Sequence, residues 1–347
     1  MSRWCYDRET EMKIVVVGAT GNVGIALLRV LKDHPDVEQI VGIARRPPGN
    51  DGPAEAGFGG RVQWVAADIV SDDLRSAFEG ADVVVNLAWQ IQPARERGQM
   101  HLTNVHGSRR VFDETLACGA KALVHASSVG VYAAGPNNKL VDENWPHTGI
   151  STSSYSRDKA AVEAMLDRLE ATHPELRVVR MRPGLVFQRA AGTEIAHYFL
   201  GRLVPRSAVR PRWLPAIPLP PQIRFQVVHA DDLATAYAAA ITRDVRGAFN
   251  IAADPVLDVE RLAAFFNARP LPVPLRLMRG LASLGYRLHL QPTDAGWVDL
   301  AAQTPLMDVT RARTELDWQP RMAADAALLD LTEGIRDKAT GPTPVLR

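Results

Sequence analysis

A tyrosine and a lysine four positions apart, Tyr155 and Lys159, are the residues of this sequence best suited to proton transfer. They open a helical pattern that continues through Val162, Met165 and Leu166, so both side chains share one helix face. A phenol with its ordinary pKa near 10 is a poor base at neutral pH. A lysine ammonium about 4 Å away favours phenolate by a few kcal/mol, about two to three pKa units, at an effective dielectric of about 20. The spacing predicts a tyrosine that exchanges protons with an alcohol or ketone, although one such pair also arises by chance.

Two serines follow an apolar run at residues 121–126, which is typical of a buried parallel strand. The carboxyl ends of such strands form the face where α/β sheets bind ligands. We therefore expect the Ser128 hydroxyl to donate to a substrate carbonyl oxygen, with Ser127 as the second candidate. The structural alternative for either serine is a capping role.

A glycine-rich turn follows the β-branched run at residues 14–17, and an apolar helical pattern starts immediately after it. Gly18, Gly21 and Gly24 lack the Cβ atoms that would keep backbone N–H groups away from a pyrophosphate, and the helix N-terminus supplies partial positive charge. In this context the glycines predict a dinucleotide site rather than an ordinary strand-to-helix turn. The predicted cradle consists of Gly18, Thr20, Gly21, Asn22, Val23 and Gly24.

The end of the second predicted strand, residues 39–43, bears on the choice of cofactor. An acidic residue about twenty positions past the glycines usually holds the ribose 2′-hydroxyl. Here Ala44 stands there, followed by Arg45 and Arg46, and no acid appears before Asp51. Because an arginine fork clamps a 2′-phosphate that a carboxylate would repel, we predict NADP in preference to NAD. A solvated arginine pair at a strand end is the alternative.

Strands alternate with helices through the first two thirds of the chain, which predicts an α/β fold: a Rossmann-type doubly wound parallel sheet with a smaller, mainly helical C-terminal substrate domain. The predicted strands are 14–17, 39–43, 61–66, 82–86, 121–126, 177–181, 225–228 and 249–251, and the predicted helices include 71–79, 98–117, 153–171, 258–268, 275–289 and 323–338. Asp231 or Asp232 is expected to cap a helix that ends at Ile241. We expect a flexible leader at 1–12, a dinucleotide-binding core at 13–186 and 225–252, a substrate-binding region at 187–224 and 253–338, and a tail at 339–347.

The composition restricts the class of protein. A net charge of +1 over 347 residues provides no bulk field for nucleic acid or an anionic membrane. Two cysteines, Cys5 and Cys118, are too few for a disulfide framework, and the nine histidines show no ligand-like pairing, so no metal is expected. No apolar run is long enough to predict a membrane span, and the first eleven residues lack the apolar core of a secretion signal. These features predict a cytoplasmic protein.

Taken together, these motifs resemble the extended short-chain dehydrogenase/reductase family, of the NAD-dependent epimerase/dehydratase type. The resemblance runs through residues 13–252. The matching segments are 18–24 (GATGNVG), 68–69 (DI), 86–88 (NLA), 104–107 (NVHG), 127–132 (SSVGVY), 155–159 (YSRDK), 182–184 (RPG) and 228–232 (VHADD), with 316–320 (LDWQP) similar to a C-terminal signature.

The resemblance implies a role for each matching residue. Tyr155 would be the general acid/base, Lys159 would hold the nicotinamide ribose, and Ser128 would bind the reacting oxygen. Asn104 would help to hold the helix geometry that places Lys159. Asp68 and Ile69 would flank the adenine and Leu87 and Ala88 the ribose side, and the predicted cofactor site is completed by Ala126, Pro183 and Val186. The resemblance also suggests a homodimer paired through helices 98–117 and 153–171.

Departures from the family pattern narrow the reaction. Val129 and Gly130 stand where sugar dehydratases of this type carry an acidic pair, so dehydration is not expected. Leu185 replaces the asparagine usual in nucleotide-sugar enzymes, and Phe187-Gln188 replaces the usual aromatic-glycine pair. Both changes weaken the case for a UDP-sugar.

Three further features have two interpretations each. Trp89, Trp145 and Trp213 line either an apolar substrate pocket or the core. Five arginines, at 202, 206, 210, 212 and 224, either grip an anionic substrate or belong to a solvated loop. The amphipathic, basic segment 275–290 either meets a membrane surface or packs on the second domain.

The sequence thus predicts an NAD(P)-dependent oxidoreductase that moves hydride between nicotinamide and the carbonyl/alcohol pair of a small-molecule substrate. The alternative among enzymes is an epimerase, which oxidises its substrate transiently and returns the hydride to the opposite face. The alternative from another class is a non-catalytic NADP-binding regulatory protein, which would need the glycine cradle but not the serine, tyrosine and lysine.

Overall fold

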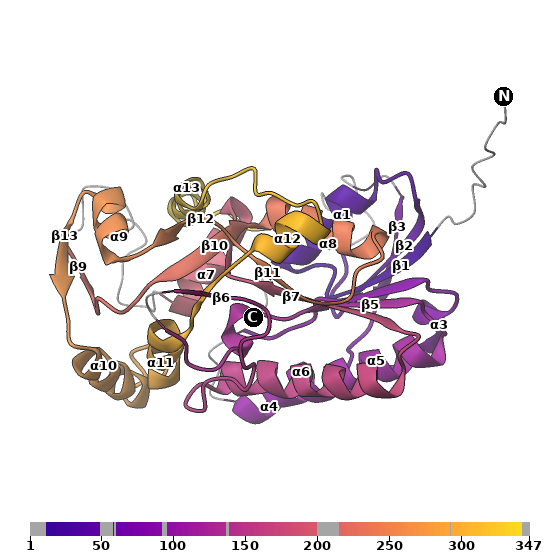
Figure 1. The fold of residues 1–347 in the computed structure, drawn as a ribbon, viewed down its shortest axis with the longest axis horizontal. Helices are drawn as coiled ribbons and strands as arrows, with labels where there is room; N and C mark the ends of the chain where they lie inside the picture. Colours follow the sequence, from indigo (N-terminus) through magenta and orange to yellow (C-terminus); the bar gives the residue numbers. More distant parts are fainter. Residues whose placement is uncertain are drawn as a thin grey trace.

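A seven-stranded parallel sheet forms the centre of the computed structural model (Figure 1). The structure describes residues 12–48, 58, 60–91, 96–136, 139–199, 215–291 and 293–341. The strand order is β11-β7-β5-β4-β1-β2-β3, and each neighbouring pair runs parallel. The strands are β1 (Met12–Val17), β2 (Val37–Ala44), β3 (Val62–Ala66), β4 (Val83–Asn86), β5 (Ala122–Ala126), β7 (Arg177–Pro183) and β11 (Gly247–Ile251). The chain order reverses direction between β1 and β4, and a reversal of this kind opens the crevice where such sheets bind ligands.

Helices cover both faces of this sheet, which is why β1 reads as a continuous apolar run rather than an alternating one. Residues 14–17 of β1 are fully buried. The helices α1 (Asn22–Leu31), α8 (Ala230–Thr242) and α12 (Thr310–Glu315) lie on one face, and α3 (Arg75–Phe78), α5 (Ser108–Ala117) and α6 (Ser154–Thr172) lie on the other (Figure 1). The predicted doubly wound parallel sheet is therefore confirmed.

The predicted helix at 98–117 has the expected extent but a different internal geometry. It consists of α4 (Arg97–His101), a π-helical turn at Leu102–Gly107 and α5. A Cβ atom at Gly107 would lie 2.6 Å from the side chain of Ile69, so glycine at this position lets the turn pack closely against that side chain. Asn104 lies within this π-helical turn.

Two local predictions are wrong. Helix α3 spans only Arg75–Phe78 instead of 71–79, because the carboxylates of Asp68, Asp72 and Asp73 accept nearby backbone N–H groups and hold the preceding residues in turns. The N-cap of α8 is His229, whose ring nitrogen accepts from the N–H of Asp231, and neither aspartate provides it. Strand β10 (Phe225–His229) runs directly into α8, so the capping position falls on the last strand residue.

The remaining elements form a lobe at one end of the molecule (Figure 1). A three-stranded sheet joins β8 (Leu185–Phe187), β10 (Phe225–His229) and β12 (Ala253–Leu257), and a two-stranded sheet joins β9 (Ala216–Leu219) and β13 (Arg269–Pro272). The helices here are α7 (Gly192–Phe199), α9 (Val259–Phe266), α10 (Leu275–Arg287), α11 (Ala295–Gln303) and α13 (Ala324–Arg336), and a short pair β6 (Leu140–Val141) and β14 (Leu306–Met307) lies between the lobe and the main sheet.

The chain returns to the main sheet after this lobe. Trp318 is buried in the same apolar cluster as α1 and α8, and its indole N–H donates to the carbonyl of Asp232 at 2.9 Å. None of the helices in the described ranges is long and apolar enough to cross a bilayer. Several predicted features lie outside the described residues, namely 1–11, Asp51, the arginines at 202, 206, 210 and 212, Trp213 and 342–347.

Candidate functional site

The structure brings Ser128 and Tyr155 into direct contact. Ser128 follows β5 and caps a short 3₁₀ turn, its Oγ accepting from the N–H of Gly130 at 3.0 Å. Tyr155 lies in the first turn of α6, which Ser153 caps, and its ring lies beside Gly130 and the Ser128 side chain, which acts to lower the pKa of the phenol. A Cβ atom at Gly130 would lie 2.8 Å from the tyrosine ring. The tyrosine therefore occupies space that a larger residue at position 130 would take.

Lys159 lies one helical turn after Tyr155 and is buried, with 3% of its surface exposed. Its Nζ donates to the carbonyl oxygen of Ala126 at 2.6 Å and lies 3.4 Å from the centre of the Trp89 ring. Burial lowers the pKa of Lys159 to about 7, and the negative charge of Glu163 opposes that shift. The lysine, the serine and the tyrosine are thus assembled from two elements, β5 and α6.

The pKa of Tyr155 shifts in the direction opposite to the sequence prediction. Burial raises the pKa of Tyr155 to about 12, and the hydrogen bond with Ser128 acts the other way. The physical reason is that the ammonium of Lys159 is bound to the Ala126 carbonyl and the Trp89 ring, so desolvation dominates at the phenol. In this structure the phenol is protonated at neutral pH.

A fully buried carboxylate, Glu163, lies one turn beyond Lys159 and was not identified from the sequence. It accepts from Ser127 Oγ at 2.5 Å, from Arg182 Nε at 2.9 Å and Nη2 at 2.7 Å, and from Arg180 Nη1 at 3.2 Å. These contacts lower the pKa of Glu163 to about 2 despite its burial. Ser127 is therefore a structural residue that ties β5 to α6. The spacing of Tyr155, Lys159 and Glu163, four residues apart each time, was the signal for it in the sequence.

The glycine turn passes a geometric test for close backbone approach. Gly18 has a φ of +81°, and a Cβ atom there would lie 2.7 Å from the backbone nitrogen of Ala88. A Cβ atom at Gly24 would lie 2.6 Å from the carbonyl oxygens of Gly18 and Ala19. The turn after β1 therefore fits only glycine at these positions, which leaves backbone donors and the N-terminus of α1 exposed to a pyrophosphate.

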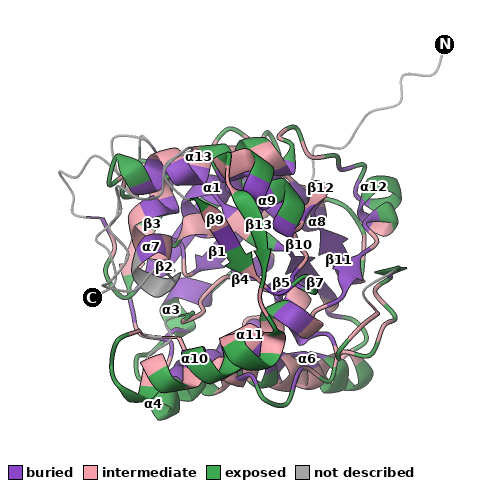
Figure 2. Cartoon of the chain, turned by 90° about the vertical axis from the view of Figure 1, so that its left-hand side faces the viewer, coloured by how far each residue is buried: buried purple, intermediate pink, exposed green. Residues whose placement is uncertain are grey.

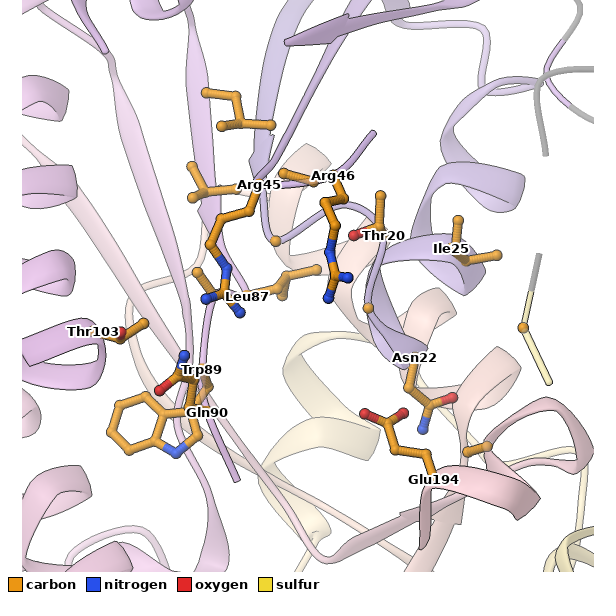
Figure 3. Close-up of a pocket in the computed structure, with 18 of the residues that line it drawn as sticks. Thr20, Asn22, Ile25, Arg45, Arg46, Leu87, Trp89, Gln90, Thr103 and Glu194 are labelled. Carbon is orange, nitrogen blue, oxygen red and sulfur yellow. The ribbon is translucent and has the colours of Figure 1, made fainter. Parts of the chain in front are cut away.

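A pocket begins at this turn and extends along the carboxyl ends of β1, β2 and β4 (Figure 3). Arg45 and Arg46 extend into it from the end of β2 (Figure 3). The predicted cofactor residues that line it are Gly18, Thr20, Gly21, Asn22, Arg45, Arg46, Asp68, Ile69, Leu87 and Ala88. The other predicted cofactor residues do not line the pocket. Val23 and Val186 pack against the apolar core, and Gly24 packs against the backbone of Gly18 and Ala19. The carbonyl oxygen of Ala126 accepts from Lys159, and Pro183 is the last residue of β7.

Trp89 connects this pocket to the residues around Tyr155. Trp89 lines the pocket, and its ring meets that of Tyr155 edge to face with centroids 6.1 Å apart. The Lys159 ammonium lies over the Trp89 ring in a cation–π contact. Asn104 holds the adjacent residue, accepting from the N–H of Gln90 at 2.8 Å and donating to its carbonyl at 3.1 Å. Asn104 thus holds the segment that carries Trp89.

A second tryptophan reaches Tyr155 from the far lobe. Trp297, in α11, lies with its ring centroid 5.4 Å from that of Tyr155 at an interplanar angle of 34°. Sequence analysis missed it, because no local pattern marks a contact between residues this far apart in the chain. Trp145 has a structural role, since its indole N–H donates to the carbonyl of Ala133 and it packs against the apolar cluster that contains Tyr132 and Met307.

Comparisons with known proteins agree with this architecture. The chain is 25% identical over 342 residues to the uncharacterized protein Rv0501 of Mycobacterium tuberculosis (strain ATCC 25618 / H37Rv), a match that covers 96% of this chain and 85% of the relative. It is 23% identical over 358 residues to the uncharacterized protein YbjS of Escherichia coli (strain K12), covering 95% of this chain and 100% of the relative.

Among solved structures, the UDP-glucose 4-epimerase of Thermotoga maritima matches with a TM-score of 0.70 at 16% identity, covering 94% of this chain and 99% of that one. The UDP-glucuronic acid 4-epimerase of Bacillus cereus in complex with NAD matches with a TM-score of 0.70 at 17% identity and the same coverage. At these identities the likeness establishes the fold. The sequence model of one family matches residues 14–252, and the chain belongs to that family, the NAD dependent epimerase/dehydratase family.

Proposed function

We propose that this protein is an NAD(P)-dependent oxidoreductase that transfers hydride between nicotinamide and a carbonyl/alcohol substrate. The observation that carries the proposal is the assembly of Ser128, Tyr155 and buried Lys159 around Gly130 and the end of β5, adjoining a pocket that starts at a glycine turn. A protein that only sensed the nucleotide would need the turn and the pocket, but not a buried lysine beside a phenol and a hydroxyl.

The proposed roles follow from the protonation states. When bound, the nicotinamide supplies or accepts the hydride at the reacting carbon. Because burial raises the pKa of Tyr155 to about 12, its protonated phenol is ready to donate a proton to a carbonyl oxygen as that carbon is reduced. The Ser128 oxygen accepts from the N–H of Gly130, and the proposed role of its own O–H is to donate to the developing alkoxide. These states favour the reductive direction at neutral pH.

We propose NADP as the preferred cofactor. Arg45 and Arg46 line the pocket at the end of β2, Arg29 lines it from α1, and the position that commonly holds an acid is Ala44. Guanidinium groups stabilise the dianionic 2′-phosphate that distinguishes NADP from NAD.

An epimerase is the second candidate, and the similarity in fold to two UDP-sugar 4-epimerases favours it. A dehydratase is disfavoured, because Val129 and Gly130 provide no carboxylate where the family's sugar dehydratases carry an acidic pair. Trp89 and Trp297 both lie against the tyrosine ring, which suits a substrate with an apolar face.

The test is to mix purified protein with NADPH or NADH and a panel of aldehydes, ketones and nucleotide sugars, and to follow both absorbance at the reduced nicotinamide band and substrate identity. Net consumption of NADPH with one substrate class supports the oxidoreductase. Stereochemical inversion without net consumption would replace it with the epimerase. Tight nucleotide binding with neither reaction, across the whole panel, would overturn both enzyme assignments.

A further inference from the structure

Helix α10 leaves a row of large apolar side chains exposed to solvent. Leu277, Leu281, Leu284 and Leu288 are 53%, 59%, 53% and 57% exposed, whereas Ala282 on the opposite side is buried. Spacings of four, three and four residues place the four leucines on one stripe of the helix, which we call the leucine face. Figure 2 shows α10 largely exposed at the surface, in contrast to the buried strands behind it.

The charge around the leucine face has one sign. The segment from Arg261 to Thr293 contains five arginines and no acidic residue, although the chain as a whole carries 39 acidic residues in 347. At about 100° per residue, Arg276 and Arg287 lie on one flank of the stripe, within reach of a plane that the leucines enter. The nearest carboxylates in sequence, Asp294 and Asp299, are paired with Arg97 and Arg279.

We propose that the leucine face docks the protein onto an anionic lipid bilayer, with the leucines inserted at the headgroup boundary and Arg276 and Arg287 bound to lipid phosphates. A second copy of the chain fits less well. A symmetric pair built on this stripe would add a second set of arginines, whereas the two carboxylates next to Arg287, those of Asp294 and Asp299, are already paired with Arg97 and Arg279. Anionic headgroups supply the missing negative charge.

The position of α10 gives the docking a consequence for the site. Helix α10 packs on α11, and α11 carries Trp297 onto the ring of Tyr155. A bilayer beneath the leucine face would therefore be separated from the tyrosine by α10 and α11, at the end of the molecule opposite β3 (Figure 1). The inference itself depends only on the exposed leucines and arginines and stands apart from the proposed reaction.

The experiment is co-sedimentation of the full chain with vesicles of phosphatidylcholine alone or of phosphatidylcholine containing phosphatidylglycerol. We expect partition into the anionic vesicles and at least about tenfold less into the neutral ones. Leu281→Ser with Leu284→Ser should reduce partition into anionic vesicles about a hundredfold, at about tenfold for each leucine. Leu329→Ser is the matched control, because Leu329 is a similarly exposed leucine on α13 (45%).

The charge component is tested separately. Arg276→Gln with Arg287→Gln should weaken partition about 25-fold, at about fivefold for each charge, and should reduce its dependence on salt. Arg109→Gln, at an exposed arginine on α5, should change neither. Equal partition of wild type into neutral and anionic vesicles, or leucine variants that partition like wild type, would overturn the proposal. A dimer in sedimentation equilibrium that only the leucine variants dissociate, without vesicle binding, would assign the face to a second copy instead.

Discussion

The two ends of this molecule differ in what they bury: the region next to the main sheet buries charged side chains, and the far lobe exposes apolar ones. Next to the main sheet, Lys159, Glu163 and Arg182 are almost fully buried, and each is held by neighbouring polar groups. In the far lobe, α10 exposes its leucines, and all four residues of β13 are exposed.

This difference indicates that the region next to the main sheet tolerates few substitutions. Buried charges are stable only in a complete set of partners, so the network around α6 fixes the geometry of Tyr155 and Lys159. The far lobe contributes Trp297 to the site but leaves most of its surface free for recognition. Proposed chemistry and proposed docking are therefore assigned to regions with different physical constraints.

The largest expected effect is on turnover. Tyr155→Phe removes the phenolic proton and should lower kcat about a thousandfold or more, with nucleotide Kd changed less than about twofold. Tyr132→Phe is the control: its phenol bonds Asn250 and Arg182 instead, so that variant should lose about 1–3 kcal/mol of stability and keep its turnover. Turnover that survives in the Tyr155 variant would contradict the catalytic assignment.

The next effect is on stability. Glu163→Gln leaves Arg180 and Arg182 short of a buried negative charge and should lower the free energy of unfolding by about 3 kcal/mol at neutral pH. Glu315→Gln, in an exposed pair with Arg311, should cost under about 0.5 kcal/mol. The two are compared by urea denaturation monitored by circular dichroism.

The same variant makes a prediction about pH. The pKa of Glu163 is lowered to about 2 in the folded protein from an ordinary 4.5, so its contribution to stability is complete above pH 4.5 and is lost as the pH falls toward 2. The stability difference between wild type and Glu163→Gln should shrink over that window. A difference that stayed constant with pH would mean that the carboxylate charge is not its source.

Removing the buried Lys159 is expected to change the free energy of unfolding by a smaller amount and in the opposite direction. Its folded pKa of about 7 lies below the ordinary 10.5, so the unfolded chain binds the extra proton and stability rises with pH between these values. Lys159→Met should therefore raise the free energy of unfolding by about 1–2 kcal/mol at pH 7, fading toward pH 10.5, while abolishing turnover. Lys121→Met, at an exposed lysine, should have little effect on either quantity. A destabilised Lys159 variant at pH 7 would contradict the desolvation argument.

The smallest effect concerns cofactor choice. Arg45→Ala with Arg46→Ala should weaken NADP binding about tenfold, with NAD binding changed less than about twofold, because only NADP carries the 2′-phosphate. Arg75→Ala, at an exposed arginine outside the pocket, is the control. Quenching of tryptophan fluorescence gives both affinities, since Trp89 lines the pocket. Equal losses for the two nucleotides would refute the NADP preference.

Local patterns in the sequence were enough to predict the parallel sheet, the glycine turn and the shared helix face of Tyr155 and Lys159. Each depends on residues close in the chain: β-branched runs form strands, missing Cβ atoms permit tight turns, and a spacing of four aligns helix side chains. Only the tertiary structure decided that Glu163 is neutralised by two arginines of β7, that Trp297 reaches Tyr155 and that the leucines of α10 stay exposed. It also reversed the expected pKa shift of Tyr155, because the partners of the Lys159 ammonium and the desolvation of the phenol depend on contacts between distant segments.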